Sequence, residues 1–241
     1  MDNCFSKLKF QNGIKDGLPI GLGYFPVAFA FGVQASILGV PILISLLISM
    51  TNLTSAGQLA GLTIVASLGS FLEIILTQLV INSRYFLMST MLSQKTDGSF
   101  NFKHRLMTSA FITDEIFAIA VSKPNNINRN YFYGLALLPY LGWALGTLFG
   151  ATAGTLLPES VVLSLGIALY AMFIAIIIPP STKNLGVLFA VILSAGVSCL
   201  FYYLPLLKKV SSGFAIIISA ILSASIIAYF FPVKKEKNVN D

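Results

Sequence analysis

Two acidic residues embedded in apolar sequence are the first candidates for chemistry. Asp114 and Glu115 are neighbours in FITDEIFAIA, with apolar residues on both sides. A charge at the middle of a membrane helix costs about 2.5–3.5 kcal/mol even on the lenient insertion scale, so such residues normally face a cavity or a partner. Successive helical residues are about 100° apart, so both carboxylates can point to one interior. The alternative is a re-entrant segment that keeps both acids near water.

A basic residue that could complement these acids ends the long second apolar run. Arg84 follows Asn82 and precedes Tyr85. An arginine pairs well with a carboxylate through two parallel hydrogen bonds. The alternative is that Arg84 extends to the cytoplasmic interface and fixes orientation. We include Arg84 and Asn82 among the candidates for substrate binding or coupling.

Polar residues also interrupt the same run at two earlier points. The patch TNLTSAGQ extends from Thr51 to Gln58, and Glu73 lies in FLEIILTQLV. Unwound backbone and polar side chains in mid-membrane are how many secondary transporters hold small solutes. The patch could instead provide hydrogen bonds between helices, and Glu73 could pair with Arg84 or lie near an interface. We predict a binding or coupling role for Gln58 and Glu73.

No arrangement typical of an enzyme or a metal site occurs in the sequence. The one histidine, His104, lies in the polar stretch QKTDGSFNFKHR. HExxH, nucleotide-binding glycine loops and GxSxG are absent from the sequence. Cys4 and Cys199 have no disulfide or metal spacing. We therefore predict no catalytic residues, no metal and no cofactor.

The elements that must position these residues are membrane helices. Apolar residues make up 56% of the 241-residue chain, charged residues only 10%, and the mean hydropathy is +0.85. A typical soluble domain has about 25% charged residues. The net charge of +6 comes from chain ends and short loops, which is the pattern of cytoplasmic loops rather than of a nucleic-acid surface. We expect a multi-pass protein of the cytoplasmic membrane, with the lipid bilayer as solvent.

Long apolar runs define the expected helices, because each backbone group in lipid must be satisfied within its own segment. A crossing needs about 20 apolar residues. The runs are Leu18–Leu38, Pro41–Ile81, Leu106–Ser122, Tyr131–Leu157, Val161–Ile178, Leu185–Leu204 and Val210–Phe231. The second is too long for one helix and has no charged loop for two, and the third is short. We predict an all-α polytopic transmembrane bundle of six to eight spans with broken or re-entrant helices.

Charge distribution ranks the possible topologies. With six spans, every Lys and Arg except Lys208 and Lys209 lies on the cytoplasmic side, whereas seven or eight spans divide them more evenly. We expect an even number of spans and cannot choose between six and eight. The chain is then one membrane domain, 1–241, whose segments 1–16 and 232–241 are cytoplasmic tails.

Glycines at regular spacing predict a close helix contact. Gly142, Gly146, Gly150 and Gly154 lie four residues apart and share one stripe of a helix, so another backbone can approach closely. We assign this stripe to packing, and the neighbour could be in this chain or in a partner. A short echo exists between GYFPVAFAFG around Pro26 and LLPYLGWALG around Pro139.

Four stretches resemble the AzlC family of branched-chain amino-acid permeases. They are PIGLGYFPVAFAFG from Pro19, SAGQ ending at Gln58, NSRYFLMS from Asn82, and TDEIFA from Thr113. Order and spacing also match, over roughly residues 17–178. The resemblance implies export of leucine, isoleucine, valine and also methionine, together with a small, separately encoded membrane subunit of the AzlD type. Many relatives have histidine where this chain has Tyr85, and tyrosine cannot relay protons near neutral pH as histidine can.

These observations give one functional expectation and two alternatives. We expect a secondary transporter that exports branched-chain amino acids and is driven by an ion gradient. Arg84 would hold the substrate carboxylate, and Asp114 or Glu115 would hold the ammonium group or a coupling proton. Tyr24, Phe25 and Phe29 are candidates for the apolar pocket, and Thr113 is a further candidate. The alternatives are a transporter of another small amphipathic solute and a non-transporting scaffold or sensor.

Overall fold

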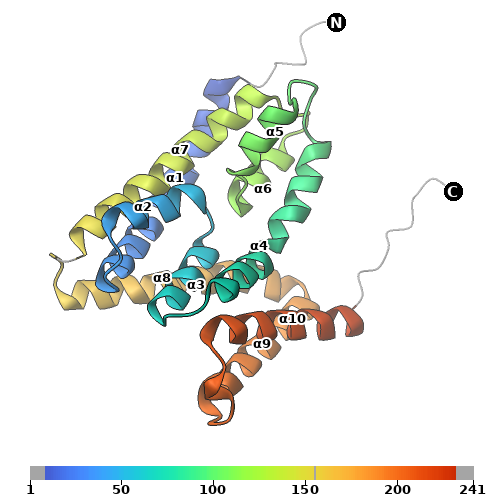
Figure 1. Ribbon diagram of the computed structural model, residues 1–241. Coiled ribbons are helices and arrows are strands. Elements are labelled where there is room, and N and C mark those ends of the chain that lie inside the picture. The colour runs from blue at the N-terminus through green and yellow to red at the C-terminus, as the bar shows by residue number, and fades with distance from the viewer. Residues whose placement is uncertain (1–8, 155, 232–241) are drawn as a thin grey trace, which may run out of the picture. The chain divides into compact units, whose positions relative to one another are not determined.

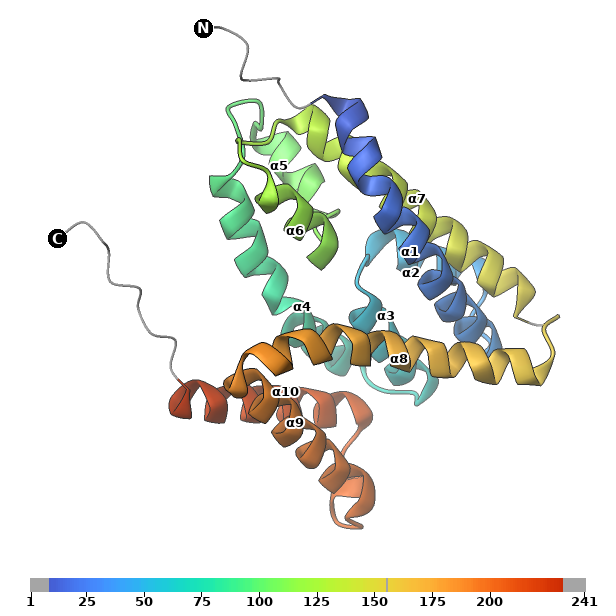
Figure 2. The same cartoon turned by 180° about the vertical axis from the view of Figure 1, so that it is seen from behind.

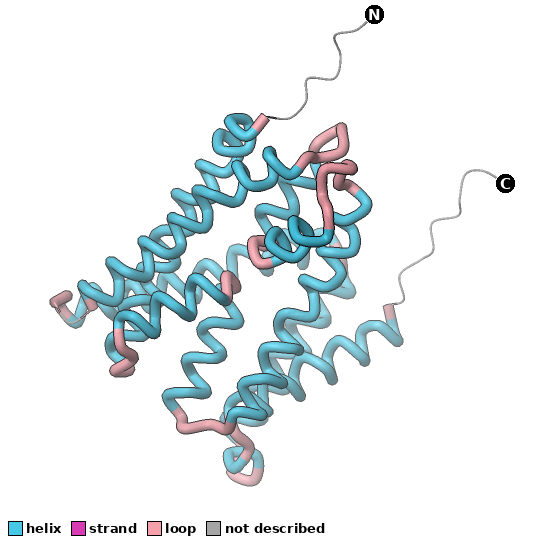
Figure 3. The backbone as a smooth tube through the Cα atoms, turned by 45° about the horizontal axis from the view of Figure 1, so that its top comes forward, coloured by secondary structure: helices cyan, strands magenta, loops and turns pink. Residues whose placement is uncertain are grey.

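The computed structural model describes residues 9–154 and 156–231, with only part of the side chains of helix α8. The described chain is all-helical and contains no strand (Figures 1 and 3), as the apolar runs predict. The expected tail at 232–241 lies outside the described residues. The α-helices are α1 (Phe10–Ile37), α2 (Ile42–Thr51), α3 (Ser55–Ala66), α4 (Phe71–Gln94), α5 (Phe102–Ser109), α6 (Asp114–Ser122), α7 (Arg129–Ala153), α8 (Glu159–Lys183), α9 (Leu185–Tyr203) and α10 (Ser212–Phe230).

The chain forms two compact units. The first contains Met1–Leu62 and Ile81–Leu169, and the second contains Thr63–Val80 and Tyr170–Asp241. Helix α1 begins at Phe10, so it includes part of the segment 1–16 that we expected as a tail. The first unit holds most of the buried side chains, and each unit is described by itself below.

Helices α1 and α7 form the centre of the first unit and run side by side in the same direction (Figures 1 and 2). A Cβ added to Gly134 would meet the backbone of Phe10, one added to Gly142 would meet Gly21, and one added to Gly150 would meet Phe29. Residue numbers rise together along both helices, so the pair is parallel. Glycines let the two backbones touch, which is how helices associate where lipid removes the hydrophobic driving force.

Helices α2 and α3 form a re-entrant hairpin against the C-terminal half of the α1–α7 pair. Helix α2 starts just after α1 ends and reaches the middle of α7, where the Tyr140 hydroxyl donates to the Met50 carbonyl (3.3 Å). Helix α3 then turns back, because Leu62 packs with Phe31 and Ala35 near the end of α1. The break between the two helices falls in the polar patch, at Asn52–Thr54 of the sequence.

Helices α5 and α6 form a second hairpin, which enters from the opposite end of the pair (Figure 2). Their eight and nine residues give lengths of about 12–14 Å, far short of a hydrocarbon core of about 30 Å. The loops before and after them are bonded together, because Asp97 N–H donates to the Ile127 carbonyl (3.0 Å) and Ile127 N–H donates to the Lys95 carbonyl (2.9 Å). The hairpin therefore enters and leaves at the same end, which is the re-entrant one of the two alternatives that the sequence left open for the third run.

The two hairpins favour the six-span topology. Within the described part of the chain, five helices are long and apolar enough to cross a membrane, namely α1, α4, α7, α9 and α10, and α8 is 25 residues long. Neither hairpin crosses. Apart from Arg84, the described basic residues of the first unit gather at the end where α1 and α7 begin, which is the pattern expected of a cytoplasmic side. They are Lys9, Lys15, Lys95, Lys103, Arg105, Lys123 and Arg129.

In the second unit, the antiparallel helices α9 and α10 pack on each other through small polar residues. The Ser198 hydroxyl donates to Ser219 Oγ at 3.3 Å. The first turn of α4 joins the start of α10, where Gly213 N–H donates to Glu73 Oε1 at 2.7 Å. The outer faces of α9 and α10 are exposed and apolar, as expected for surfaces in lipid.

Candidate functional site

The break between α5 and α6 places three candidate residues together. Thr113 precedes the first residue of α6 and caps it, with its hydroxyl oxygen accepting from Ile116 N–H (3.4 Å). The Tyr24 hydroxyl, from the middle of α1, lies 2.7 Å from Thr113 Oγ1. The same hydroxyl donates to a carboxylate oxygen of Glu115. The start of α6 is therefore held against α1 through one phenol.

The neighbouring acid is paired with the candidate arginine. Asp114 Oδ2 lies 2.9 Å from Arg84 Nη1, and the two side chains are 39% and 40% exposed. Arg84 Nη2 donates to the Tyr85 hydroxyl (3.1 Å), and its guanidinium lies 5.0 Å from the centre of that ring. Both members of the pair retain open surface, and so does Glu115. The Arg84–Asp114 pair is therefore not sealed inside the first unit, and all three charged groups remain accessible.

A second polar network lies at the break between α2 and α3. Gln58 is buried, accepts from Trp143 Nε1 at 2.9 Å and donates to Ser49 Oγ at 2.8 Å. Ser49 Oγ in turn lies 2.6 Å from Thr147 Oγ1. The network connects both arms of the first hairpin to α7, so the unwound segment is fixed by side chains.

One aromatic contact joins the two networks. The rings of Tyr24 and Trp143 meet edge to face, with centroids 5.0 Å apart. Helices α3 and α6 both begin at these breaks, so both bring positive N-terminal ends into the interior. Broken helices whose ends face a common interior are the arrangement by which many transporters bind charged solutes.

A separate set of contacts anchors the second hairpin at the end of the unit where α1 and α7 begin. Asp16 of α1 lies 2.7 Å from Lys123 Nζ and accepts from the Tyr131 hydroxyl at 2.6 Å. His104 lies 2.9 Å from the Tyr133 hydroxyl through Nδ1 and 2.9 Å from Arg129 Nη1 through Nε2. These contacts hold the base of the second hairpin. Its tip, at Thr113, is the part that contacts Tyr24.

Three further candidates lie on α1 and α4, outside the set of contacts described above for the tip of the second hairpin. Phe25 is 37% exposed and its ring contacts Phe29 and Phe149, on a different face of α1 from Tyr24. Asn82 comes two residues before Arg84 on α4, so the two side chains leave that helix about 200° apart. Glu73 belongs to the second unit, where it is buried.

The glycine stripe of α7 faces α1 within this chain. A Cβ on Gly146 would lie 2.9 Å from Ala28 Cβ and 3.1 Å from the Phe29 nitrogen, and it would overlap the Phe25 carbonyl oxygen. A Cβ on Gly154 would lie 2.8 Å from Ser36 Cβ. Close helix packing is thus what these positions do in the structure.

Sequence reasoning missed the partners of Gln58. Trp143, Ser49 and Thr147 all bond in one buried chain with it. A lone indole N–H inside an apolar run was the available signal, because a buried tryptophan usually finds an acceptor. Ser49 and Thr147 carried no such signal, since single hydroxyls are common in membrane helices.

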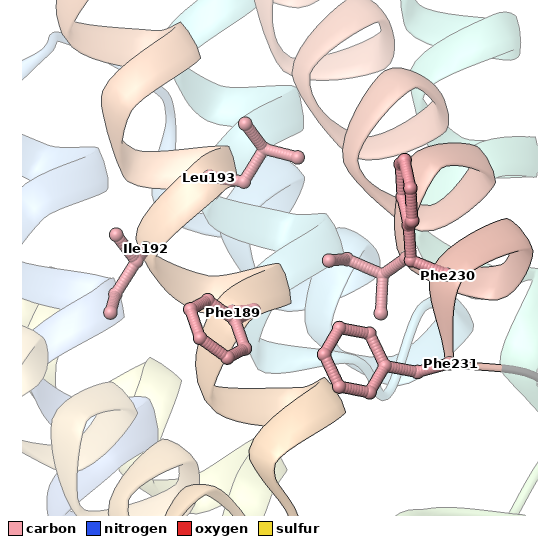
Figure 4. Close-up of a pocket in the computed structure, with 6 residues that line it drawn as sticks. Phe189, Ile192, Leu193, Phe230 and Phe231 are labelled. Atoms are coloured by element: carbon pink, nitrogen blue, oxygen red, sulfur yellow. The ribbon is translucent and has the colours of Figure 1, made fainter.

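The second unit has an apolar groove that does not suit a zwitterion. It measures about 300 Å³ between α9 and the end of α10 (Figure 4). Only carbon side chains line it, namely Phe189, Ile192, Leu193, Ile227, Phe230 and Phe231. An ammonium or carboxylate placed there would lose its hydration without a partner. Among the described residues, no group of His, Cys, Asp and Glu could hold a metal ion.

Comparisons with known proteins place the chain among membrane proteins of one family. The family model described as "AzlC protein" matches residues 19–157, which contain both hairpins. A chain of Archaeoglobus fulgidus named "Uncharacterized membrane protein" is 32% identical over 74% of this chain and 79% of its own length. "Inner membrane protein YgaZ" of Escherichia coli K12 is 31% identical over 70% of this chain and 72% of its own length. No solved structure matches.

Proposed function

The chain belongs to the AzlC protein family, a family of membrane transporters, and from this premise we propose that it exports branched-chain amino acids. The substrates would be leucine, isoleucine and valine, and also methionine. The observation that supports the proposal is the pairing of an open acid cluster with an arginine at a helix break. That combination matches the two opposite charges that every free amino acid carries.

The charged groups of the substrate have complementary partners at the tip of the second hairpin. Arg84 offers parallel N–H donors for the substrate carboxylate, a contact that it now makes with Asp114. The freed Asp114, or Glu115 beside it, would take the ammonium group. The substrate thus replaces an internal ion pair instead of adding an unpaired charge, which keeps desolvation cost low.

The aliphatic side chain needs an apolar wall close to these charges. The ring of Tyr24 and the edge of Trp143 lie next to the Thr113 and Glu115 contacts. An apolar wall separates substrates that differ by one methylene by only about 1–3 kcal/mol. Such a site would accept the branched and aliphatic amino acids as a group rather than one of them.

Transport would use the two hairpins as gates. They enter from opposite ends of the α1–α7 pair, and each is tied to it by a small number of polar side chains. Rearranging one hairpin while the other stays packed would expose the site to one side at a time. The energy would come from an ion gradient, and a small membrane subunit of the AzlD type would be the partner.

The proposal is tested by uptake of labelled leucine into inverted membrane vesicles that contain the chain, with and without a co-expressed small subunit. Export from cells appears there as accumulation. The alternative of another amphipathic solute predicts no leucine uptake but uptake of a different solute in the same vesicles. If the chain is a scaffold or sensor, the vesicles should take up no solute through it, and the chain should tolerate neutralisation of Asp114 and Glu115.

A further inference from the structure

Glu73 is a buried carboxylate whose charge has no described counterpart. It is 2% exposed in the first turn of α4. Its Oε1 accepts from Gly213 N–H at 2.7 Å, and no ion pair joins it to any described residue. A buried charge without compensation is strongly destabilising. Something beyond this one hydrogen bond has to accompany Glu73.

Two glycines make room around the Glu73 carboxylate. A Cβ on Gly213 would lie 2.5 Å from Glu73 Oε1 and Cγ, and a Cβ on Gly69 would lie 2.9 Å from Glu73 Oε2. Any larger residue at either position would push the carboxylate away. The carboxylate therefore sits in a cradle formed by the α3–α4 turn and the start of α10.

Three hydroxyls on the segments that form this cradle are buried and have no hydrogen-bond partner among the described residues. They belong to Thr77, Ser211 and Ser212. Thr77 is 0% exposed and lies one turn after Glu73 on the same face of α4. Ser211 and Ser212 directly precede Gly213, whose N–H holds the carboxylate. Each unsatisfied buried polar group costs about 1–3 kcal/mol, so three such hydroxyls on the two segments that hold the Glu73 carboxylate point to a missing ligand.

We propose that Glu73, Thr77, Ser211 and Ser212 form a binding site for a monovalent cation of the size of sodium. The donor set is oxygen only, which suits hard cations. It carries a single negative charge, which matches one positive charge and not two.

The site would face the outer side of the membrane, where it could admit the ion that drives export. Glu73 lies in the first turn of α4 and Gly213 in the first turn of α10, and the six-span topology puts the beginnings of both helices outside. Lys208 and Lys209 lie in the loop just before α10 and are exposed. The cation site uses no residue of the proposed amino-acid site, and its existence does not depend on the substrate assignment.

A purely structural role for Glu73 is the competing explanation. Ser70, three residues earlier, accepts from Glu73 N–H at 3.2 Å, which is half of a capping box. In a full capping box the Glu73 carboxylate would accept from the Ser70 backbone N–H. Here it accepts from Gly213 N–H at the start of α10 instead. A cap of this kind accounts for the Gly213 contact but leaves the Thr77, Ser211 and Ser212 hydroxyls unexplained.

Thermal unfolding of the purified chain in sodium chloride and in choline chloride, at equal ionic strength and pH and without amino acid, tests the proposal. A ligand that binds only the folded state raises Tm with its concentration. We expect sodium to raise Tm of the wild-type chain above the choline control. Glu73→Gln should abolish this sodium-specific rise, and Thr77→Val should reduce it. Thr90→Val, an exposed threonine of the same helix, is the matched control and should retain the full rise.

Three results would overturn the cation site. Equal Tm in sodium and choline for the wild-type chain would leave Glu73 as a cap. A sodium-specific rise that survives in Glu73→Gln, or survives undiminished in Thr77→Val, would place sodium elsewhere. A Tm that responds to pH but not to sodium would make Glu73 a proton site. If Glu73→Gln does not fold, Thr77→Val decides, because it keeps the carboxylate and nearly the same volume.

Discussion

The hydroxyl of Tyr24 donates a hydrogen bond to the carboxylate of Glu115, across ninety-one positions of sequence. This contact fixes the first turn of α6 to the middle of α1. The ring of Tyr24 packs edge to face against Trp143, whose indole N–H donates to Gln58 of the first hairpin. Tyr24 therefore connects the two helix breaks, and its hydroxyl is the point where that connection reaches a charged group.

Tyr24→Phe should reduce leucine transport while the protein still reaches the membrane. The change removes the hydrogen bonds to Thr113 and Glu115 but keeps the ring against Trp143. A hydrogen bond to a charged group contributes about 1.5–3 kcal/mol, so flux should fall roughly 10-fold or more. Flux and abundance are measured together in vesicles. Tyr229→Phe, an exposed residue of α10, is the control, and an equal flux in both variants would contradict the role of the Tyr24 hydroxyl.

Trp143→Phe and Gln58→Leu should destabilise the chain in a coupled way. Each single change leaves the other residue's polar group buried without its partner, which costs about 1–3 kcal/mol. The double variant removes both groups at once and should be less destabilised than the sum of the two. Thermal or denaturant unfolding of all four chains measures the coupling. Strict additivity would mean that the 2.9 Å contact between Trp143 and Gln58 contributes nothing to stability.

Gly146→Leu should prevent assembly of the first unit. Even a single Cβ there would overlap the Phe25 carbonyl and lie 2.9 Å from Ala28 Cβ, and forced separation of packed elements costs about 1–3 kcal/mol or more. Membrane abundance and detergent stability should both fall. Gly196→Leu on α9, where a Cβ would meet nothing within 4 Å, should leave them unchanged. Normal levels of Gly146→Leu would show that α1 and α7 do not pack through this stripe.

Cysteine labelling should place both termini in the cytoplasm and the two hairpins on opposite sides. In a chain without Cys4 and Cys199, Leu68→Cys in the exposed α3–α4 turn should react from outside intact cells. Gly98→Cys, in the loop before α5, and the two terminal variants Asn3→Cys and Asn238→Cys should react only after permeabilisation. The clustered lysines motivate this orientation. Labelling of Asn238→Cys from outside would exclude an even number of spans.

Hydropathy was sufficient to predict the helical class, because apolar runs of about 20 residues have one solution in lipid. It also identified both irregular runs, since Thr51–Gln58 and Asp114–Glu115 are polar where a plain span would be apolar. What it could not give was direction. An apolar run with a polar middle has the same sequence pattern whether its second half crosses the membrane or turns back to the side from which it came. For the second run, the contacts of Leu62 with Phe31 and Ala35 show that α3 turns back toward the end of α1.

The site could be predicted only where a residue type was conspicuous. Charged residues in apolar sequence are costly, so Arg84, Asp114 and Glu115 stood out. Tyr24 and Phe25 are adjacent aromatics that sequence cannot separate, yet a helix turns by about 100° between them. One consequently faces Trp143 and the other faces Phe29 and Phe149. Trp143 was missed because an indole in an apolar run resembles ordinary membrane packing.

Labelled leucine uptake into inverted vesicles, compared between the wild-type chain, Asp114→Asn and Glu115→Gln at matched abundance, tests the central claim most directly. We predict accumulation by the wild-type chain that unlabelled isoleucine and valine reduce. Asp114→Asn should insert normally and lose transport by about 10-fold or more. The reason is that the substrate ammonium group would lose its carboxylate partner, and a charge left unpaired costs about 2–5 kcal/mol. Full transport in both variants would remove the acids from the mechanism. Equal uptake by vesicles with and without the wild-type chain would contradict the proposed function itself.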